Sequence, residues 1–194
     1  MGGKPMVHYA VSMLRDILQH IPQDAEFHPE GNVWTHTFAV RRALDEAVAL
    51  LPDFQIDKAD RNLLRLAAWC HDLGKANATI FRNNRWTAPG HEKPKHLNAV
   101  LRQLGNPWRS FWQAGSLEDR KTFLYVCTRH MAISDSRGID PRIMRALRSA
   151  DPRRSRRAKL AIVLMVMDRL GTMRKSRMGD AMIVVRVLCS PRSI

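Results

Sequence analysis

The chain has 194 residues, a formal net charge of +14, three cysteines without C-x-x-C spacing, and no unbroken apolar run longer than the eight residues of 160–167. These features exclude a disulfide framework and a membrane-spanning helix, which needs ~20 apolar residues, and the N-terminus lacks the apolar segment of a secretion signal. We therefore expect one soluble cytoplasmic domain over residues 1–194, without membrane contact.

Apolar residues at i, i+3 and i+4 spacing predict the first two helices, at 7–21 and 33–51, joined by a polar loop at 22–32. His36 lies in the first turn of the second helix, four residues before the apolar Val40. Its imidazole is therefore expected over the buried stripe. A histidine in that position is either a core residue with a satisfied partner or a ligand facing a neighbouring helix.

A third helix is predicted at about 57–74, capped by Asp57 or Asp60 and ending at Gly74, which permits a left-handed exit. His71, Asp72 and Lys75 stand at the end of this apolar helix, where their desolvation requires partners. A divalent cation bound by His71 and Asp72, with Lys75 turned toward an anion, would supply them. The alternative is a capped helix end with a surface His–Asp pair and a lysine favoured by the helix dipole.

The second half of the chain is also predicted to be helical. Residues 76–90 form a long connection of the kind that is often functional, and 179–189 fits either a helix or a strand. Four helices are expected, at about 91–104, 118–132, 141–150 and 154–170. The sequence thus predicts an all-α bundle of about six to eight helices, with its core at about 28–172.

Most of the net positive charge lies at 137–177, which contains thirteen Arg or Lys residues and only three Asp residues. Such a basic block favours a polyanionic partner, nucleic acid first, and a nucleic-acid backbone would bind the arginines of the two last predicted helices. These are Arg142, Arg145, Arg148, Arg153, Arg154 and Arg157. The alternative is a solvated face remote from the site. Similarly, Trp86, Trp108 and Trp112 either stack a base or pack in the core.

Asp168 follows the longest apolar run and lies among apolar neighbours on its helix. An ionised carboxylate there requires a partner, either an arginine from elsewhere or a cation. Together with His36, His71 and Asp72, it forms a mixed nitrogen and oxygen set, which suits Mn, Fe, Co, Ni or Mg better than a thiolate-bound zinc. A divalent ion in such a site creates a nucleophilic water near neutral pH.

The order of His36, the HDLGK segment at 71–75 and a distant Asp168 resembles the HD superfamily of metal-dependent phosphohydrolases. The text His28-Pro-Glu-Gly-Asn-Val-Trp-Thr-His36-Thr is similar to the HD domain of bacterial CCA-adding tRNA nucleotidyltransferases, here without the polymerase head. The resemblance implies an HD-domain helical bundle that stands alone. It also implies that His36, His71, Asp72 and Asp168 bind the metal, with Asp72 and Lys75 as catalytic residues.

In HD proteins with more histidines, further positions bind a second metal or the substrate phosphate. By this resemblance His91, His130, Lys75 and Arg129 are candidates for substrate phosphate or for a second ion. For His91 and His130, lining the site and lying outside it remain equal alternatives. His28 is expected to be structural or exposed.

The resemblance implies a metal-dependent phosphohydrolase acting on nucleotide phosphate esters or RNA ends, such as 2′,3′-cyclic phosphates. One alternative is a nucleoside 5′-phosphate or dNTP phosphohydrolase, in which the basic helices steer free nucleotides. The other is a nucleic-acid-binding module that keeps a structural metal.

Overall fold

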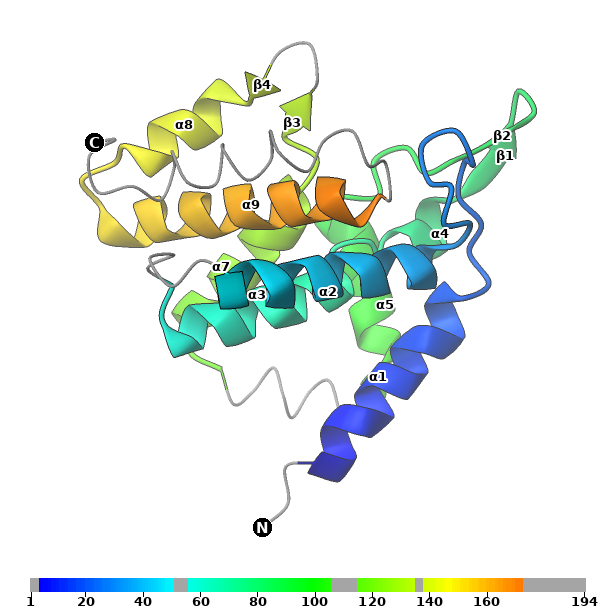
Figure 1. Ribbon diagram of the computed structural model, residues 1–194, viewed down its shortest axis with the longest axis horizontal. Helices are drawn as coiled ribbons and strands as arrows, with labels where there is room; N and C mark the ends of the chain where they lie inside the picture. Colours follow the sequence, from blue (N-terminus) through cyan, green and yellow to red (C-terminus); the bar gives the residue numbers. More distant parts are fainter. Residues whose placement is uncertain (1–3, 51–55, 106–114, 135–137, 173–194) are drawn as a thin grey trace.

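A computed structural model of the chain describes residues 4–50, 56–105, 115–134 and 138–172. Regular structure in these ranges is mostly helical, which confirms the all-α prediction (Figure 1). Every described helix is too short or too polar to cross a membrane. The helices are α1 (Lys4–Leu18), α2 (Val33–Leu50), α3 (Lys58–Cys70), α4 (Lys75–Ala78), α5 (Pro94–Gln103), α7 (Leu117–Arg129), α8 (Pro141–Leu147) and α9 (Pro152–Gly171).

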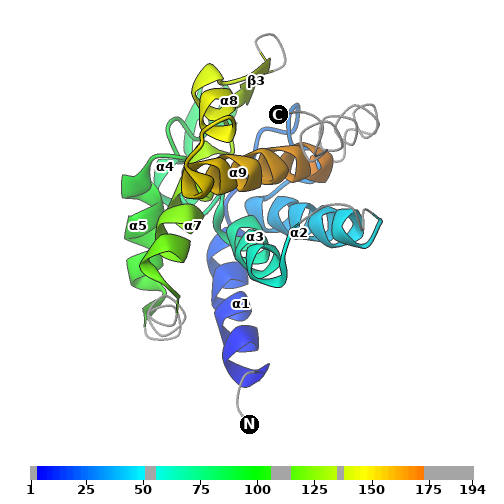
Figure 2. The ribbon, with the colours of Figure 1, turned by 90° about the vertical axis from the view of Figure 1, so that its left-hand side faces the viewer.

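Helix α9 is the centre of the fold and packs against α2, α3, α7 and α8. Figures 1 and 2 show it running alongside α2, while α1 projects away from the bundle. Every residue from Leu160 to Met167 is buried. A helix that is apolar on all sides must be covered on all sides, which explains why this eight-residue run became the core rather than one face of a surface helix.

Helix α3 begins where the sequence predicts, because the Asp57 side chain accepts a hydrogen bond from the Asp60 backbone N–H at 2.7 Å. Its end differs from the prediction. Gly74 has φ −60° and ψ −20°, a right-handed conformation, and the chain continues directly into the short helix α4. Gly74 is required there for a different reason, since its missing side chain admits another backbone segment, as described below.

The connection at 76–90 is more ordered than expected. After α4 it forms a hairpin of β1 (Ile80–Arg82) and β2 (Arg85–Thr87), with Phe81 opposite Trp86. Asn83 and Asn84 make the turn with positive φ angles of 51° and 61°, which asparagine tolerates better than most residues. A second small hairpin pairs β3 (Ile133–Ser134) with β4 (Gly138–Ile139). Residues 179–189, Trp108 and Trp112 lie outside the described ranges.

Candidate metal centre

Four of the predicted residues converge in a first cluster, which consists of His36, His71, Asp72 and Asp168. His36 Nε2 lies 2.8 Å from Asp168 Oδ1 and 3.6 Å from Asp72 Oδ2. His71 Nε2 lies 3.5 Å from Asp72 Oδ2 and 3.4 Å from Asp168 Oδ1. The cluster therefore joins α2, the end of α3 and the last turns of α9, although His36 and Asp168 are 132 residues apart in sequence.

A close helix contact brings Asp168 to His36. Gly171, one turn after Asp168, lies so near α2 that a Cβ there would come within 2.5 Å of Val40 Cγ2 and 2.8 Å of Val40 N. Val40 is one turn after His36, so the same contact aligns the two ligand-bearing turns. The two helix backbones can approach this closely only because residue 171 has no side chain.

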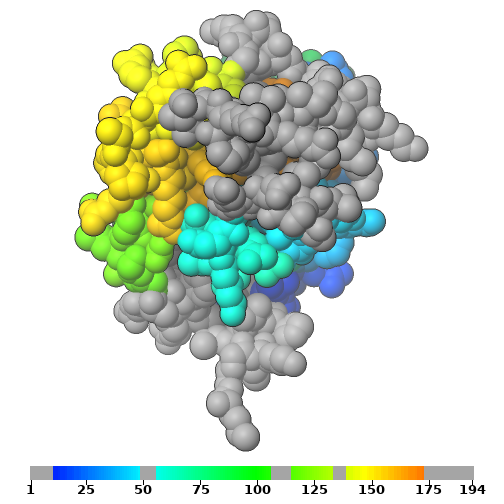
Figure 3. All heavy atoms as spheres, turned by 60° about the vertical axis from the view of Figure 1, so that its left-hand side comes forward, coloured from blue at the N-terminus to red at the C-terminus, as the bar shows by residue number. Residues whose placement is uncertain are grey.

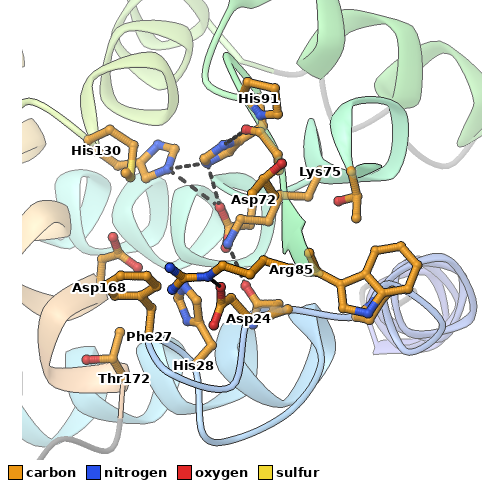
Figure 4. A pocket seen from close by; sticks show the side chains of 18 of the residues that line it. Asp24, Phe27, His28, Asp72, Lys75, Arg85, His91, His130, Asp168 and Thr172 are labelled. Atoms are coloured by element: carbon orange, nitrogen blue, oxygen red, sulfur yellow. Dashed lines mark hydrogen bonds and ion pairs between the residues drawn. The ribbon is translucent and has the colours of Figure 1, made fainter. Parts of the chain in front are cut away.

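Asp72 also belongs to a second cluster, which it forms with His91 and His130. Its Oδ1 lies 3.2 Å from His91 Nε2 and 3.5 Å from His130 Nε2, and the two Nε2 atoms are 3.2 Å apart (Figure 4). Gly74 makes this possible, because a Cβ at this position would lie 2.0 Å from the His91 carbonyl oxygen. The structure thus brings His91 and His130 to the site, and each of the two Asp72 carboxylate oxygens faces one of the clusters.

The four histidines of the two clusters are oriented alike. The Nδ1 atoms of His71, His91 and His130 contact the carbonyl oxygens of the residues three positions earlier, at 2.9, 2.8 and 2.6 Å. The Nδ1 of His36 contacts Glu30 Oε1 at 2.8 Å. A carbonyl or carboxylate oxygen only accepts, so each Nδ1 donates and each Nε2 is directed into the clusters. This is the orientation of metal-binding histidines.

The donor set fits a cation. His71 Nε2 is buried without a hydrogen-bond partner among the described residues, and it faces Asp72 Oδ2 in the first cluster at 3.5 Å. Metal–ligand bonds of ~2.0–2.2 Å place neighbouring ligand atoms about 3–3.6 Å apart, the range seen between most atoms of both clusters. Each cluster thus contains a buried group of His and Asp residues that could hold a metal ion.

The electrostatics of the first cluster also require positive charge. Burial alone would raise the pKa values of Asp72 and Asp168. The nearby Lys75 and His71 hold the pKa of Asp72 well below its usual range, and the hydrogen bond from His36 together with the nearby His71 does so for Asp168. Burial would lower the pKa of His36, yet its bonds to Asp168 and Glu30 raise it to about 9. Without a cation, a proton on His36 therefore balances the carboxylates.

Glu30 is a site residue that the sequence analysis missed. Its fully buried carboxylate accepts hydrogen bonds from His36 Nδ1 and from His28 Nδ1, at 2.8 and 2.9 Å. Burial would raise its pKa, but the bonds from His28 and His36 lower it to about 2. His28, expected to be structural or exposed, is partly buried and also lines the pocket described below. A glutamate six residues before a candidate ligand histidine, within the Pro-Glu-Gly turn, is the signal that was available.

Lys75 is buried and its ammonium lies 2.8 Å from Asp72 Oδ2. It donates a second hydrogen bond to Gln23 Oε1 at 2.5 Å, a partner that the sequence analysis did not identify. Gln23 lies in the loop before α2, so this loop and α4 together fix the lysine beside the clusters.

A pocket of about 650 Å³ opens above both clusters. Asp72, Lys75, His91, His130 and Asp168 line its polar part (Figure 4). The loop before α2 and the β1–β2 hairpin form the other walls, and their lining residues include Phe27, His28, Arg85 and Trp86.

The arginines proposed for nucleic-acid binding lie elsewhere. Arg153 and Arg154 are exposed at the start of α9, fourteen or more residues before Asp168, which is ~20 Å along a helix. Arg157 is bound by both oxygens of Glu118, at 2.9 and 2.6 Å. This surface also includes three exposed arginines on α8 and at its end: Arg142, Arg145 and Arg148. Figure 3 shows this part of the chain in yellow.

Arg129 is in the last turn of α7, directly before His130, and its guanidinium lies over the Tyr125 ring, 5.9 Å from its centroid. It is not among the residues that line the pocket. Its proposed contact with substrate phosphate stays a prediction.

Two curated proteins resemble a part of this chain. A stretch of 59 residues is 44% identical to the Multifunctional CCA protein of Pasteurella multocida and 41% identical to the protein of that name from Mannheimia succiniciproducens. The stretch covers 30% of this chain and 13% of each relative, so the similarity concerns a small part of those proteins. No protein-family model matches the sequence, and no solved structure matches the fold. A segment of the chain is thus related to multifunctional CCA proteins.

Proposed function

We propose that the protein is an HD-type, metal-dependent phosphohydrolase that acts on phosphate esters of nucleotides or RNA ends, 2′,3′-cyclic phosphates included. The observation that carries the proposal is the division of the Asp72 carboxylate, whose two oxygens face two separate groups of histidine Nε2 atoms. Asp72 would thus serve as a ligand in both clusters if each held a divalent ion, and the relatedness to multifunctional CCA proteins supports a nucleotide or RNA substrate.

The residues of the two clusters would have the following roles. His36, His71, Asp72 and Asp168 would hold one ion of the Mn, Ni, Co, Fe or Mg type, and His91 and His130 with Asp72 a second. A bound divalent ion lowers the pKa of its coordinated water and draws charge from phosphoryl oxygens.

Lys75 would bind the substrate phosphate. An ammonium has three N–H donors, and Asp72 and Gln23 account for two of them. The third is available for an oxygen of a phosphate in the pocket that Lys75 lines. Because Lys75 is buried, this charge is weakly screened by solvent and acts strongly on the phosphate.

The test combines metal analysis of the purified protein with a screen for ester hydrolysis. Chromatography of the products is the readout, because opening a 2′,3′-cyclic phosphate gives a phosphomonoester and releases no inorganic phosphate. The substrates are 2′-, 3′- and 5′-nucleotides, 2′,3′-cyclic nucleotides and dNTPs, each with the five candidate metals. D72A should lose bound metal and fall to background turnover, because Asp72 belongs to both clusters. D16A is the matched control, since Asp16 is an exposed aspartate of α1 far along the chain from both clusters.

The outcome of the screen separates the candidate functions. Turnover of cyclic, 2′- or 3′-phosphates supports the proposal. Hydrolysis only of 5′-nucleotides or dNTPs would identify the free-nucleotide phosphohydrolase instead. A protein that retains metal and binds RNA but hydrolyses none of these esters would be the nucleic-acid-binding module.

A further inference from the structure

The pocket has a second part that the proposed reaction does not use. Its polar part contains the two clusters and Lys75, whereas the opposite walls carry the aromatic side chains of Phe27 and Trp86. These rings are 51% and 40% exposed, although they border a pocket with charged groups at its base. The pocket volume of about 650 Å³ lies in the ~300–1,000 Å³ range of small-molecule sites, more than a phosphate group alone requires.

The β1–β2 hairpin that carries Trp86 contributes no buried residue to the core, because all six of its strand residues are exposed. Phe81 and Trp86 are cross-strand partners on one face, with ring centroids 4.9 Å apart. An isolated two-stranded hairpin is marginally stable in water. The chain therefore keeps exposed aromatic rings on an element that adds little to folding, which points to a role in binding.

Arg85 fixes the hairpin across the pocket. Its guanidinium pairs with Asp24 at 2.6 Å and with Glu26, and it lies 5.2 Å above the centroid of the Phe27 ring. Figure 4 shows Arg85 reaching from the hairpin toward Phe27 and Asp24. Both carboxylates belong to the loop before α2, so three contacts of one side chain hold β2, and with it Trp86, at the wall of the pocket.

We propose that Trp86 determines substrate specificity by stacking on the nucleobase of a nucleotide whose phosphate lies at the two clusters. This inference rests on the proposed function and names the part of the substrate that the aromatic wall receives. Every nucleobase has a planar π face, and an indole is the largest flat side-chain surface available to stack on it. Arg85 lies over the Phe27 ring and Phe81 packs against the Trp86 ring, and of these two pocket rings we assign the larger, Trp86, to the base.

Direct binding tests the stacking surface without turnover. The ligand is adenosine, which has a base and no phosphate, and its affinity is measured by isothermal titration calorimetry on the purified protein. W86A should weaken binding by about 5- to 150-fold, the cost of removing one base-stacking ring, and W86F should restore most of the affinity. F38A is the matched control, because Phe38 is 54% exposed on α2 and does not line the pocket.

Kinetics then tests the role in specificity. The substrate pair is adenosine 2′,3′-cyclic phosphate and 1-O-methylribose 2′,3′-cyclic phosphate, which differ only in the base. W86A should raise KM about 5- to 150-fold for the first with kcat retained, and leave both constants unchanged for the second. A tetranucleotide with the same cyclic end distinguishes an RNA end from a free nucleotide as the substrate. A larger increase in KM by W86A on the tetranucleotide than on the mononucleotide identifies an RNA end, and an equal increase identifies a free nucleotide.

Two results would overturn the inference: an adenosine affinity that W86A leaves at the F38A value, or an equal loss on both members of the substrate pair. Neither depends on an unfolded variant, because W86F keeps an aromatic ring and must recover binding. If no phosphate ester is hydrolysed at all, the proposed function fails, and the adenosine measurement still decides the role of Trp86.

Discussion

Glu30 Oε1 lies 2.8 Å from His36 Nδ1, on the side of the imidazole opposite the Nε2 atom that faces Asp168. This carboxylate fixes both the tautomer and the ring orientation of His36. Partners of this kind contribute to metal affinity although they do not touch the ion.

Removing that partner should weaken metal binding. We expect E30A to reduce the affinity for Mn²⁺ by about 10- to 100-fold, and E30Q by less, because its amide oxygen still accepts the bond from His36. Calorimetric titration with Mn²⁺ measures both. E46Q, at an exposed glutamate of α2, serves as the control, and an E30A affinity equal to that of E46Q would show that the contact has no positioning role.

Adding a methyl group at Gly171 should push α9 away from α2. We expect G171A to lower the free energy of unfolding by ~1–3 kcal/mol and to weaken metal binding, since Asp168 moves with α9. Urea denaturation and Mn²⁺ titration measure the two effects. V40A in the G171A background removes the Cγ2 contact and leaves the backbone contact, so it should recover only part of the loss. Full stability of G171A alone would contradict the tight approach.

Gly74 should matter for the second cluster more than for the first. A Cβ at this position meets the His91 backbone oxygen, which cannot rotate away as a side chain would. We therefore expect G74A to reduce the number of Mn²⁺ ions bound per chain in the same way as H91A, as measured by metal analysis after dialysis. Unchanged stoichiometry in G74A together with a reduced one in H91A would refute this explanation of the glycine.

The pH dependence of stability should reflect the ion pair between Arg157 and Glu118. The hydrogen bond from Arg157 is the main cause that lowers the pKa of Glu118 from its usual 4.5. Because the pKa of Glu118 is lower in the folded chain than in the unfolded chain, the ionised carboxylate stabilises the fold above pH ~4.5. This contribution disappears as the pH falls through the lowered pKa. R157A should thus lower the free energy of unfolding by no more than about 1 kcal/mol at pH 7. The difference in unfolding free energy between R157A and the wild type should shrink below pH ~4, as measured by urea titrations. A difference that is constant with pH would exclude this pair as its source.

The basic surface of α8 and α9 should bind RNA through phosphates. R153E/R154E is preferable to a variant of Arg157, whose guanidinium pairs with Glu118. We expect the double variant to weaken binding and to reduce the slope of log K against log salt by ~1.4, at ~0.7 per single-strand phosphate contact. Fluorescence anisotropy over a salt series measures this. K58E/R61E changes two exposed cations of α3 instead, and an equal effect from it would indicate non-specific attraction.

The core of the candidate site could be predicted because its residues carry strong local signals. His71 and Asp72 are adjacent polar residues at the end of an apolar helix, and Asp168 follows the longest apolar run in the chain. Burial without partners is improbable for such groups, so their convergence follows from elementary energetics. His91 and His130 lacked this signal, since His91 lies in the turn before α5 and His130 directly follows α7, where periodicity does not say which way a side chain points.

The hairpin and the loop before α2 were harder to predict, because short irregular segments are determined by contacts distant in sequence. Strands of three exposed residues show no alternation between buried and exposed positions. The Asn83-Asn84 pair between Phe81 and Trp86 was the available turn signal. Gln23 and Glu30 acquire their roles only when α4 and α2 place Lys75 and His36 beside them.

The position of α9 near the end of the described chain has a consequence for synthesis. A polypeptide emerges from the ribosome N-terminus first, and α9 supplies both the apolar centre of the bundle and the Asp168 carboxylate. Until that helix has been made, α3 can pack against α2 and α7, but the sides of these helices that face α9 stay uncovered. The nascent protein therefore covers this apolar surface and closes the cluster around His36 only after α9 has been synthesised.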